Sequence, residues 1–168
     1  MADGWRTVEW GDAVRFRVPG HWAPAVEERE GMDVLTFRPA DAVGDSGGDS
    51  GGGTLNVLVD ERTPAAGQSA EAVLQEMALR FVRPDDARAS DRTVEDRADG
   101  VRLAQAAMVT EEDGRVESHY LWLLGRVDGG RVGVAMFSYT LPANLDGQEP
   151  HVSTLAALDA AIRAAELL

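Results

Sequence analysis

The chain has 168 residues, 44% of them hydrophobic and 27% charged, which suits one globular domain spanning residues 1–168. It contains neither cysteine nor lysine, so disulfides, thiol chemistry, thiolate metal sites and lysine Schiff bases are excluded. The formal net charge of −13 opposes binding to nucleic acid or to an anionic membrane surface, and we expect neither as a partner.

The N-terminal sequence indicates a cytoplasmic protein. The stretch MADGWRTVEW lacks the basic run and the apolar segment of a signal peptide. Nowhere does the sequence approach the run of about 18 apolar residues that a membrane-spanning helix requires. The lack of cysteine also fits a reducing compartment.

Residues 5–10 and 13–18 predict a β-hairpin. In the second segment, AVRFRV, apolar side chains alternate with arginines, which is the period of a half-buried strand. Gly11 and Asp12 have the composition of a hairpin turn. Further strands are predicted over residues 34–37 and 54–59, with a weaker one over 25–29.

Two helices are predicted. Ser69 suits an N-cap, and Val73, Met77 and Phe81 then recur every four residues as one apolar face. The second predicted helix covers residues 152–168. Between the helices, three strands are predicted over residues 101–110, 116–127 and 132–141, joined by turns that contain Asp-Gly.

These elements predict an α+β fold. Because the strands connect through short turns, we expect a mainly antiparallel, twisted sheet of about six or seven strands with helices packed on its faces. Trp122 and Leu124 lie on one face of a predicted central strand, and Leu121 and Leu123 lie on the other. Such a strand is buried on both sides, so we expect helices on opposite faces of the sheet.

Residues 41–53 are expected to form a flexible loop rich in glycine, aspartate and serine. The loop contains GDSGG, the string that surrounds the nucleophilic serine of trypsin-like proteases, but only 45 residues precede Ser46, too few for one β-barrel of such an enzyme. Asp41, Asp45 and Asp49 lack the ligand spacing of an EF-hand calcium loop. We therefore assign this stretch neither a nucleophile nor a metal.

The remaining polar residues show no convergent catalytic constellation, so we predict a protein that is not an enzyme and that has no cofactor. His21, His119 and His151 are too far apart for their spacing to indicate a metal site. A hydrolase using His119 is the weaker alternative, because Glu117 lies on the same strand face and could orient its imidazole as a base. A histidine on the surface of a sheet explains the pattern more simply.

Three tryptophans, Trp5, Trp10 and Trp22, are the predicted partner-binding residues. Indole side chains are favoured anchors at protein interfaces. The competing interpretation is packing in the core, because the aromatic residues are concentrated in predicted strands.

The chain resembles the Mog1/PsbP-like superfamily and its bacterial branch of small DcrB-related proteins, which includes chaperones of type VI secretion effectors. The resemblance rests on Phe16, Val18, Pro19 and Trp22 within VRFRVPGHW, on NVL in the strand at 54–59, and on the closing strand RVGVAMFSYT followed by a helix. It implies an antiparallel sheet between helices, and binding in place of catalysis. The glycine-rich insertion departs from the compact pattern of the family.

The combined expectation is a non-enzymatic protein-binding module that acts as a chaperone or adaptor for an unidentified protein. A domain that binds a small apolar ligand between sheet and helix is the alternative. In a further alternative the partner is a second copy of the chain, and the two copies form a homodimer through an unpaired edge strand.

Overall fold

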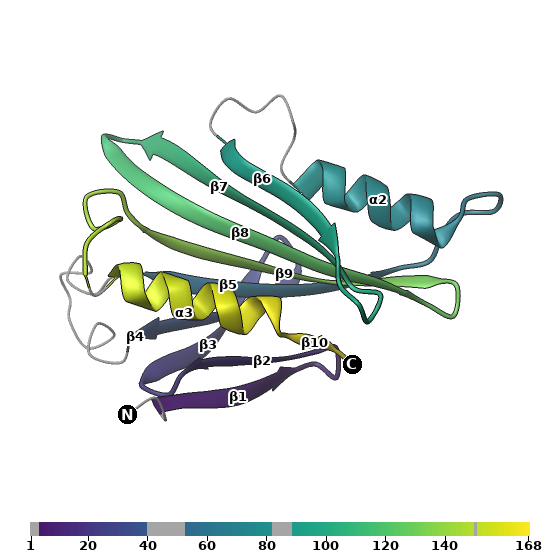
Figure 1. Cartoon of the computed structure of the whole chain (residues 1–168), viewed down its shortest axis with the longest axis horizontal. Coiled ribbons are helices and arrows are strands. Elements are labelled where there is room, and N and C mark those ends of the chain that lie inside the picture. Colours follow the sequence, from purple (N-terminus) through teal and green to yellow (C-terminus); the bar gives the residue numbers. More distant parts are fainter. Residues whose placement is uncertain (1–3, 40–52, 82–88, 150) are drawn as a thin grey trace.

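The computed structural model describes residues 4–39, 53–81, 89–149 and 151–168 (Figure 1). Within them the chain forms ten strands and two α-helices. The strands are β1 (Trp5–Trp10), β2 (Val14–Pro19), β3 (Trp22–Arg29), β4 (Met32–Pro39), β5 (Thr54–Arg62), β6 (Ala89–Asp96), β7 (Arg102–Glu112), β8 (Arg115–Asp128), β9 (Arg131–Pro142) and β10 (Glu166–Leu167). The helices are α2 (Ala70–Phe81) and α3 (His151–Arg163). Ser46, Asp41, Asp45 and Asp49 lie outside the described residues.

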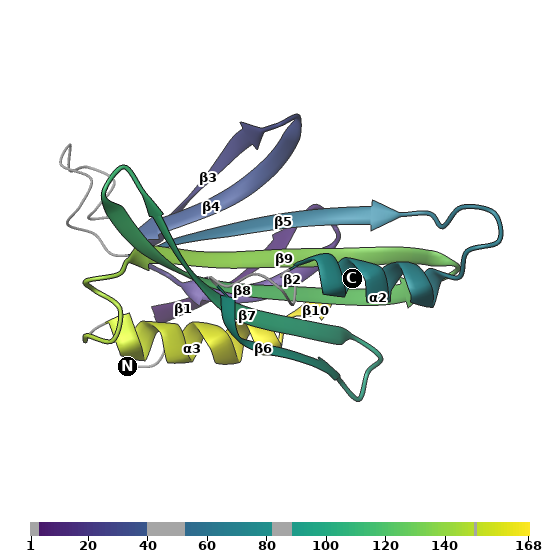
Figure 2. The ribbon, with the colours of Figure 1, turned by 90° about the horizontal axis from the view of Figure 1, so that it is seen from above.

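Seven strands form one antiparallel sheet in the order β3-β4-β5-β9-β8-β7-β6. The long strands β7, β8 and β9 follow one another through tight turns. Asp113 and Gly114 both have positive φ in the first of these turns, at 54° and 78°, which matches the twist of a hairpin. Figure 2 shows the β3–β4 hairpin bending away from β5, to which β4 is paired over only three residues. The predicted α+β fold with a mainly antiparallel sheet is confirmed.

The N-terminal hairpin forms as predicted, but it does not join the main sheet. β1 pairs with β2, and β10 pairs with the other edge of β2, giving a second sheet in the order β1-β2-β10. This corrects the expectation of a single sheet. Pro19 ends β2 because its ring nitrogen has no hydrogen to donate, and the chain turns at Gly20 before β3 starts in the other sheet.

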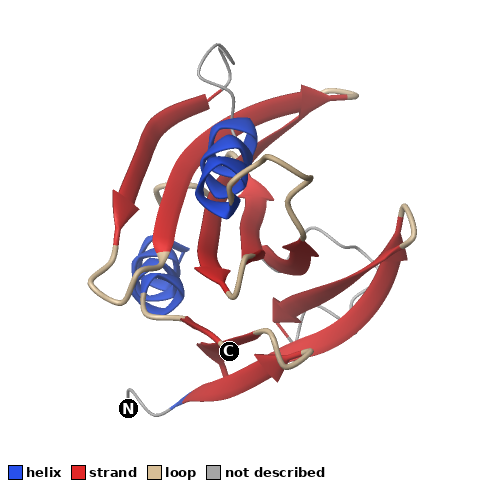
Figure 3. Ribbon diagram, turned by 90° about the vertical axis from the view of Figure 1, so that its right-hand side faces the viewer, coloured by secondary structure: helices blue, strands red, loops and turns tan. Residues whose placement is uncertain are grey.

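The two helices pack on opposite faces of the seven-stranded sheet, as predicted (Figure 3). Trp122 and Leu124 of β8 belong to a large buried cluster with Leu158 of α3. The intervening residue, Leu123, points to the other face and packs in a smaller cluster with Leu74 of α2. Neither helix of the described ranges is long and apolar enough to cross a membrane.

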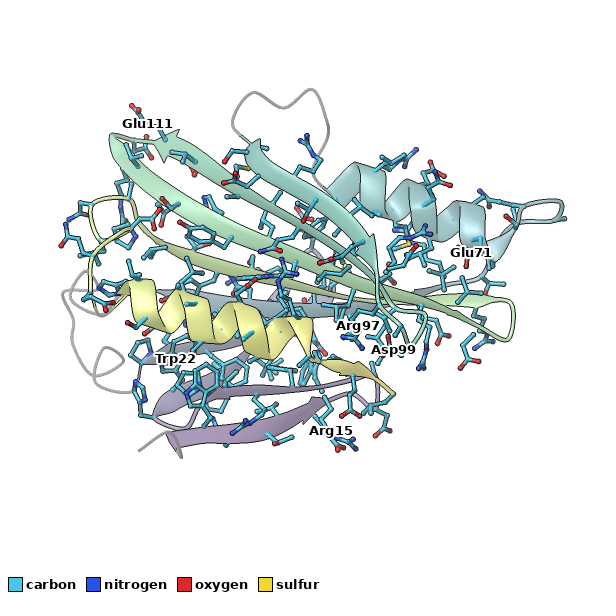
Figure 4. All side chains as sticks on the ribbon, in the orientation of Figure 1. Arg15, Trp22, Glu71, Arg97, Asp99 and Glu111 are labelled. Atoms are coloured by element: carbon cyan, nitrogen blue, oxygen red, sulfur yellow. The ribbon has the colours of Figure 1, made fainter. Side chains whose placement is uncertain are left out.

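The C-terminal helix is shorter than predicted. α3 ends at Arg163, and Glu166 and Leu167 form β10 in place of a further helical turn. Arg97 lies beside this end of the helix (Figure 4), and its Nη1 donates to the carbonyl oxygens of Arg163 at 2.8 Å and Ala165 at 2.7 Å. The guanidinium thereby binds carbonyl groups that the end of a helix leaves without partners.

A candidate partner-binding groove

Trp22 is part of the core. Its side chain is 3% exposed, and its ring stacks on that of Tyr139, with centroids 5.9 Å apart and planes 6° apart. Figure 4 shows Trp22 beneath α3. This burial makes Trp22 the least accessible of the three predicted partner-binding residues.

Trp5 and Trp10 lie at the two ends of β1. Both are half-buried and pack against the large cluster on the α3 side of the sheet. Trp5 also lines a hollow at the protein surface, whereas Trp10 contributes to none of the larger hollows of the described residues. Their role in binding a partner stays a prediction, and the geometry favours Trp5.

The hollow beside Trp5 is a groove of about 490 Å³ between the β1–β2 hairpin and α3, here named the α3 groove. Strand residues form one wall and helix residues form the other. Its lining consists of Trp5, Thr7, Arg15, Phe16, Arg17, Ala157, Ala160, Ala161, Ala164, Ala165 and Glu166.

The helix wall of the groove is built from alanines. Ala157, Ala160 and Ala161 share one side of α3, and Ala164, directly after the last helical residue, continues that side. Ala157, Ala160 and Ala164 are exposed, whereas Leu158 on another side of the helix is fully buried. α3 thus has two apolar sides, and the described part of the chain covers only one of them.

The charged residues of the groove are two arginines and one glutamate. Arg15 pairs with Glu9 at 2.7 Å and with Glu166 at 3.2 Å, and the hydrogen bond to Glu9 raises the pKa of its guanidinium. Arg17 is exposed and forms neither a hydrogen bond nor an ion pair with any residue that the structure describes. Sequence reasoning missed these residues because β2 and α3 are far apart in the chain and no local pattern brings them together.

His119 lies on the opposite face of the sheet from α3. Its Nε2 is 2.7 Å from the hydroxyl of Thr110, and its Nδ1 is 2.8 Å from the hydroxyl of Thr140. A neutral imidazole donates through one nitrogen and accepts through the other, so His119 links strands β7, β8 and β9 through two threonines. Its role as a base stays a prediction. Within the described ranges, acidic residues and histidines form no cluster of three or more that could hold a metal ion.

The space between the main sheet and α3 is filled by side chains. Trp122, Leu158 and Ile162 are each at most 1% exposed, and Asp159 accepts a hydrogen bond from the indole of Trp122 at 2.9 Å. The carboxylate also receives bonds from Gln105 and Arg163. These side chains leave no room for a small apolar ligand beneath the helix.

Comparisons with known proteins support the fold alone. No family model matches the sequence, and no curated protein matches it. Among solved structures, LpqN of Mycobacterium tuberculosis, described as involved in cell envelope biogenesis, is similar with a TM-score of 0.65 and 13% identity over 97% of this chain and 90% of its own. A protein from Bacteroides thetaiotaomicron VPI-5482 is similar with a TM-score of 0.54 and 16% identity over 100% of this chain and 49% of its own. Neither match names the Mog1/PsbP-like superfamily, so that assignment stays a prediction.

Proposed function

We propose that the protein is a non-enzymatic binding module that holds a segment of a partner protein in the α3 groove, as a chaperone or adaptor does. The observation that carries this proposal is the alanine side of α3, which the described residues leave open beside Trp5 and beside the exposed Arg17. Apolar surface next to an indole and an arginine has the composition of an interface core.

The similar structures support the fold of this chain, and they identify no partner for it. LpqN is described as involved in cell envelope biogenesis, a role compatible with binding in place of catalysis. At 13% identity its partners and its location are not transferred to this chain. The cytoplasmic location that we propose is tested by fractionating the native host and blotting for the protein.

The proposed function is tested by placing a charge in the groove. Ala160→Glu puts a carboxylate on the exposed alanine side of α3, and Ala156→Glu puts the same side chain at an exposed position of the same helix outside the groove. Tagged wild-type protein and both variants are used to capture partners from the native host, with cross-linking to map the contact. We expect the partner to cross-link to α3 and to be lost only with Ala160→Glu.

Equal recovery of the partner by both variants, or cross-links confined to another face, would contradict docking in the groove. Circular dichroism of the two variants provides the control for folding, because each exchanges one exposed alanine for a good helix former.

A small apolar ligand is the second candidate occupant. The groove volume of about 490 Å³ falls within the range of small-molecule sites. Native mass spectrometry of protein purified from its host would show such a ligand as a constant added mass that Ala160→Glu removes. The hydrolase alternative predicts a hydrolytic activity that His119→Ala abolishes while the fold is retained.

A further inference from the structure

The strands at the edges of the two sheets are β1, β3, β6 and β10, and three of them are poorly suited to pairing with another strand. In β3, Pro24 leaves the outer edge without one of its N–H donors. β6 is interrupted by a register shift between Ser90 and Thr93, and Asp91 within it has a φ of 53°. β10 has only two residues. β1, in contrast, has six residues and contains neither proline nor a register shift.

The backbone groups of every second residue of β1 point away from β2. Hydrogen-bonded and non-hydrogen-bonded residue pairs alternate along two antiparallel strands. The amide of Gly20 donates to the carbonyl oxygen of Gly4, and the next pair joins Trp5 to Pro19, whose nitrogen has no hydrogen to donate. The alternation therefore turns the N–H and C=O groups of three residues outward: Trp5, Thr7 and Glu9.

The outer edge of β1 is the longest uninterrupted free edge of the described strands. β1 pairs with β2 alone among them, and it lies at the lower border of the molecule in Figure 1. Shorter unpaired stretches remain where neighbouring strands end or diverge. In the stretch 58–62 of β5, the amide of Glu61 is already bound to the carboxylate of Asp60 at 2.9 Å. In β2 only Arg17 turns its groups outward between the pairing with β10 and Pro19.

The outward groups of β1 are spaced so that two copies of the strand complement each other. Two antiparallel copies with a twofold axis at Thr7 place Thr7 opposite Thr7, and Trp5 opposite Glu9 of the second copy. Every outward N–H and C=O group of both strands is then paired. A pair centred on Arg6 or on Glu9 would place two like charges directly opposite each other, which destabilises paired strands. A pair centred on Val8 would leave the groups of Trp5 beyond the end of the second strand.

We propose that β1 joins a second copy of the chain by antiparallel strand pairing centred on Thr7. The dimer continues the three-stranded sheet in the order β10-β2-β1-β1-β2-β10. A second copy is favoured as the occupant because it brings the same outward groups at the same spacing, and in this register neither Arg6 nor Glu9 meets a like charge opposite it. The inference does not depend on occupation of the α3 groove, because the pairing uses backbone groups of β1.

The size and the charge of this interface predict how the dimer behaves. One pair of six-residue strands is small beside the roughly 1,200 Å² that a standard interface buries, so the dimer should dissociate on dilution. Each copy carries a net charge of −13, and the two copies therefore repel each other at long range. Salt screens this repulsion, so association should strengthen as salt is added.

Sedimentation velocity of the full chain over a range of protein and salt concentrations tests the dimer. Thr7→Pro removes the N–H at the centre of the interface while leaving the bonds between β1 and β2 in place, and it should weaken association about tenfold or more. The matched control is Val26→Pro, which puts proline at an exposed position of the β3 edge, two residues after Pro24, and should leave association unchanged. Circular dichroism checks that both variants fold.

Because the chain contains no cysteine, a single introduced thiol reports the register of the pairing. Thr7→Cys places two thiols opposite each other with their Cα atoms about 5.5 Å apart, within reach of a disulfide. Glu9→Cys, at another exposed position of β1, separates them by four residues along the strands, about 14 Å, which is beyond that reach. Mild oxidation should therefore cross-link Thr7→Cys at least about tenfold faster than Glu9→Cys.

Three results would overturn the inference. The first is a chain that sediments as a monomer at every protein and salt concentration. The second is self-association that Thr7→Pro leaves unchanged, which would assign it to another surface. The third is cross-linking of Glu9→Cys as fast as that of Thr7→Cys, which would exclude the register centred on Thr7. None of these results affects the proposed function of the α3 groove, which the Ala160→Glu variant tests separately.

Discussion

Tyr120 joins the loop that precedes α3 to the face of β8. Its hydroxyl donates to the carboxylate of Asp146, with both carboxylate oxygens 2.7 Å away. Burial of the ring and the negative charge of Asp146 raise the pKa of Tyr120 to about 12 from an ordinary value of 10.0. This bond holds the start of the helix that forms one wall of the groove.

The raised pKa of Tyr120 predicts a loss of stability in alkaline solution. A folded-state pKa above the unfolded value gives a contribution that is complete below pH 10 and is lost as the pH rises towards 12. Denaturant unfolding measured at pH values from 8 to about 12 should therefore show a steeper fall for the wild type than for Tyr120→Phe. Burial also raises the pKa of Tyr139, which is present in both proteins, so the difference between the curves isolates Tyr120. Parallel curves would contradict the assigned role.

At the scale of the element, α3 is held by its end as well as by its apolar face. Arg97 comes from the turn after β6 and donates to two carbonyl oxygens at the C-terminal end of the helix. It also pairs with Asp99, and this hydrogen bond lowers the pKa of the Asp99 carboxyl to about 2. The position of α3, and with it the width of the groove, therefore depends on a residue outside both groove walls.

Replacing Arg97 by alanine should destabilise the protein by about 1.5–3 kcal/mol, the usual effect of losing hydrogen bonds from a charged donor. Arg62→Ala provides the control, because it removes an exposed arginine whose pair with Asp60 lies at the surface and should change stability by about 0–1 kcal/mol. Urea unfolding measures both values. Amide exchange at Leu167 should also speed up in Arg97→Ala only. Equal values for the two variants would show that the carbonyl contacts do not secure the helix.

Most elements could be predicted from local patterns, and the failures have physical causes. The N-cap of α2 is an example of success, because the Ser69 hydroxyl accepts from the amide of Ala72 at 3.1 Å. Strand β6 was missed because it is a polar edge strand without a buried residue, so it shows no apolar alternation. Its pairing with β7 also shifts register between Ser90 and Thr93. Such a strand is defined by its neighbour and not by its own composition.

The candidate site was predictable only in part. Trp5 could be selected because tryptophan is a frequent interface residue, but nothing in the sequence separates it from the buried Trp22. The core side of the C-terminal helix is readable from the spacing of Leu158 and Ile162, which are four residues apart and both belong to the larger cluster. The alanine side of α3 forms a groove only because the β1–β2 hairpin packs beside it. That contact joins segments far apart in the sequence, so no local pattern predicts it.

At the scale of the whole molecule, the main sheet separates two hydrophobic clusters. The larger lies on the α3 side and includes the β1–β2 hairpin, and the smaller lies under α2. Successive residues of β8 alternate between them, so each cluster holds the same strands in place from a different side. We therefore expect the two clusters to unfold together, although among the described residues no side chain belongs to both.

This cooperativity can be tested with two neighbouring leucines. Leu123 is 1% exposed and lies under α2, whereas Leu124 is 0% exposed and lies on the α3 side. All four tryptophans of the chain lie in or against the larger cluster, so tryptophan fluorescence reports on the α3 side. Replacing either leucine by alanine should lower the free energy of unfolding by about 2–5 kcal/mol. Because the strands are shared, Leu123→Ala should shift the unfolding midpoint seen by tryptophan fluorescence as far as that seen by circular dichroism. A fluorescence midpoint that stays at the wild-type value, while the circular dichroism signal falls earlier, would show that α2 and its cluster unfold separately from the face that carries the groove.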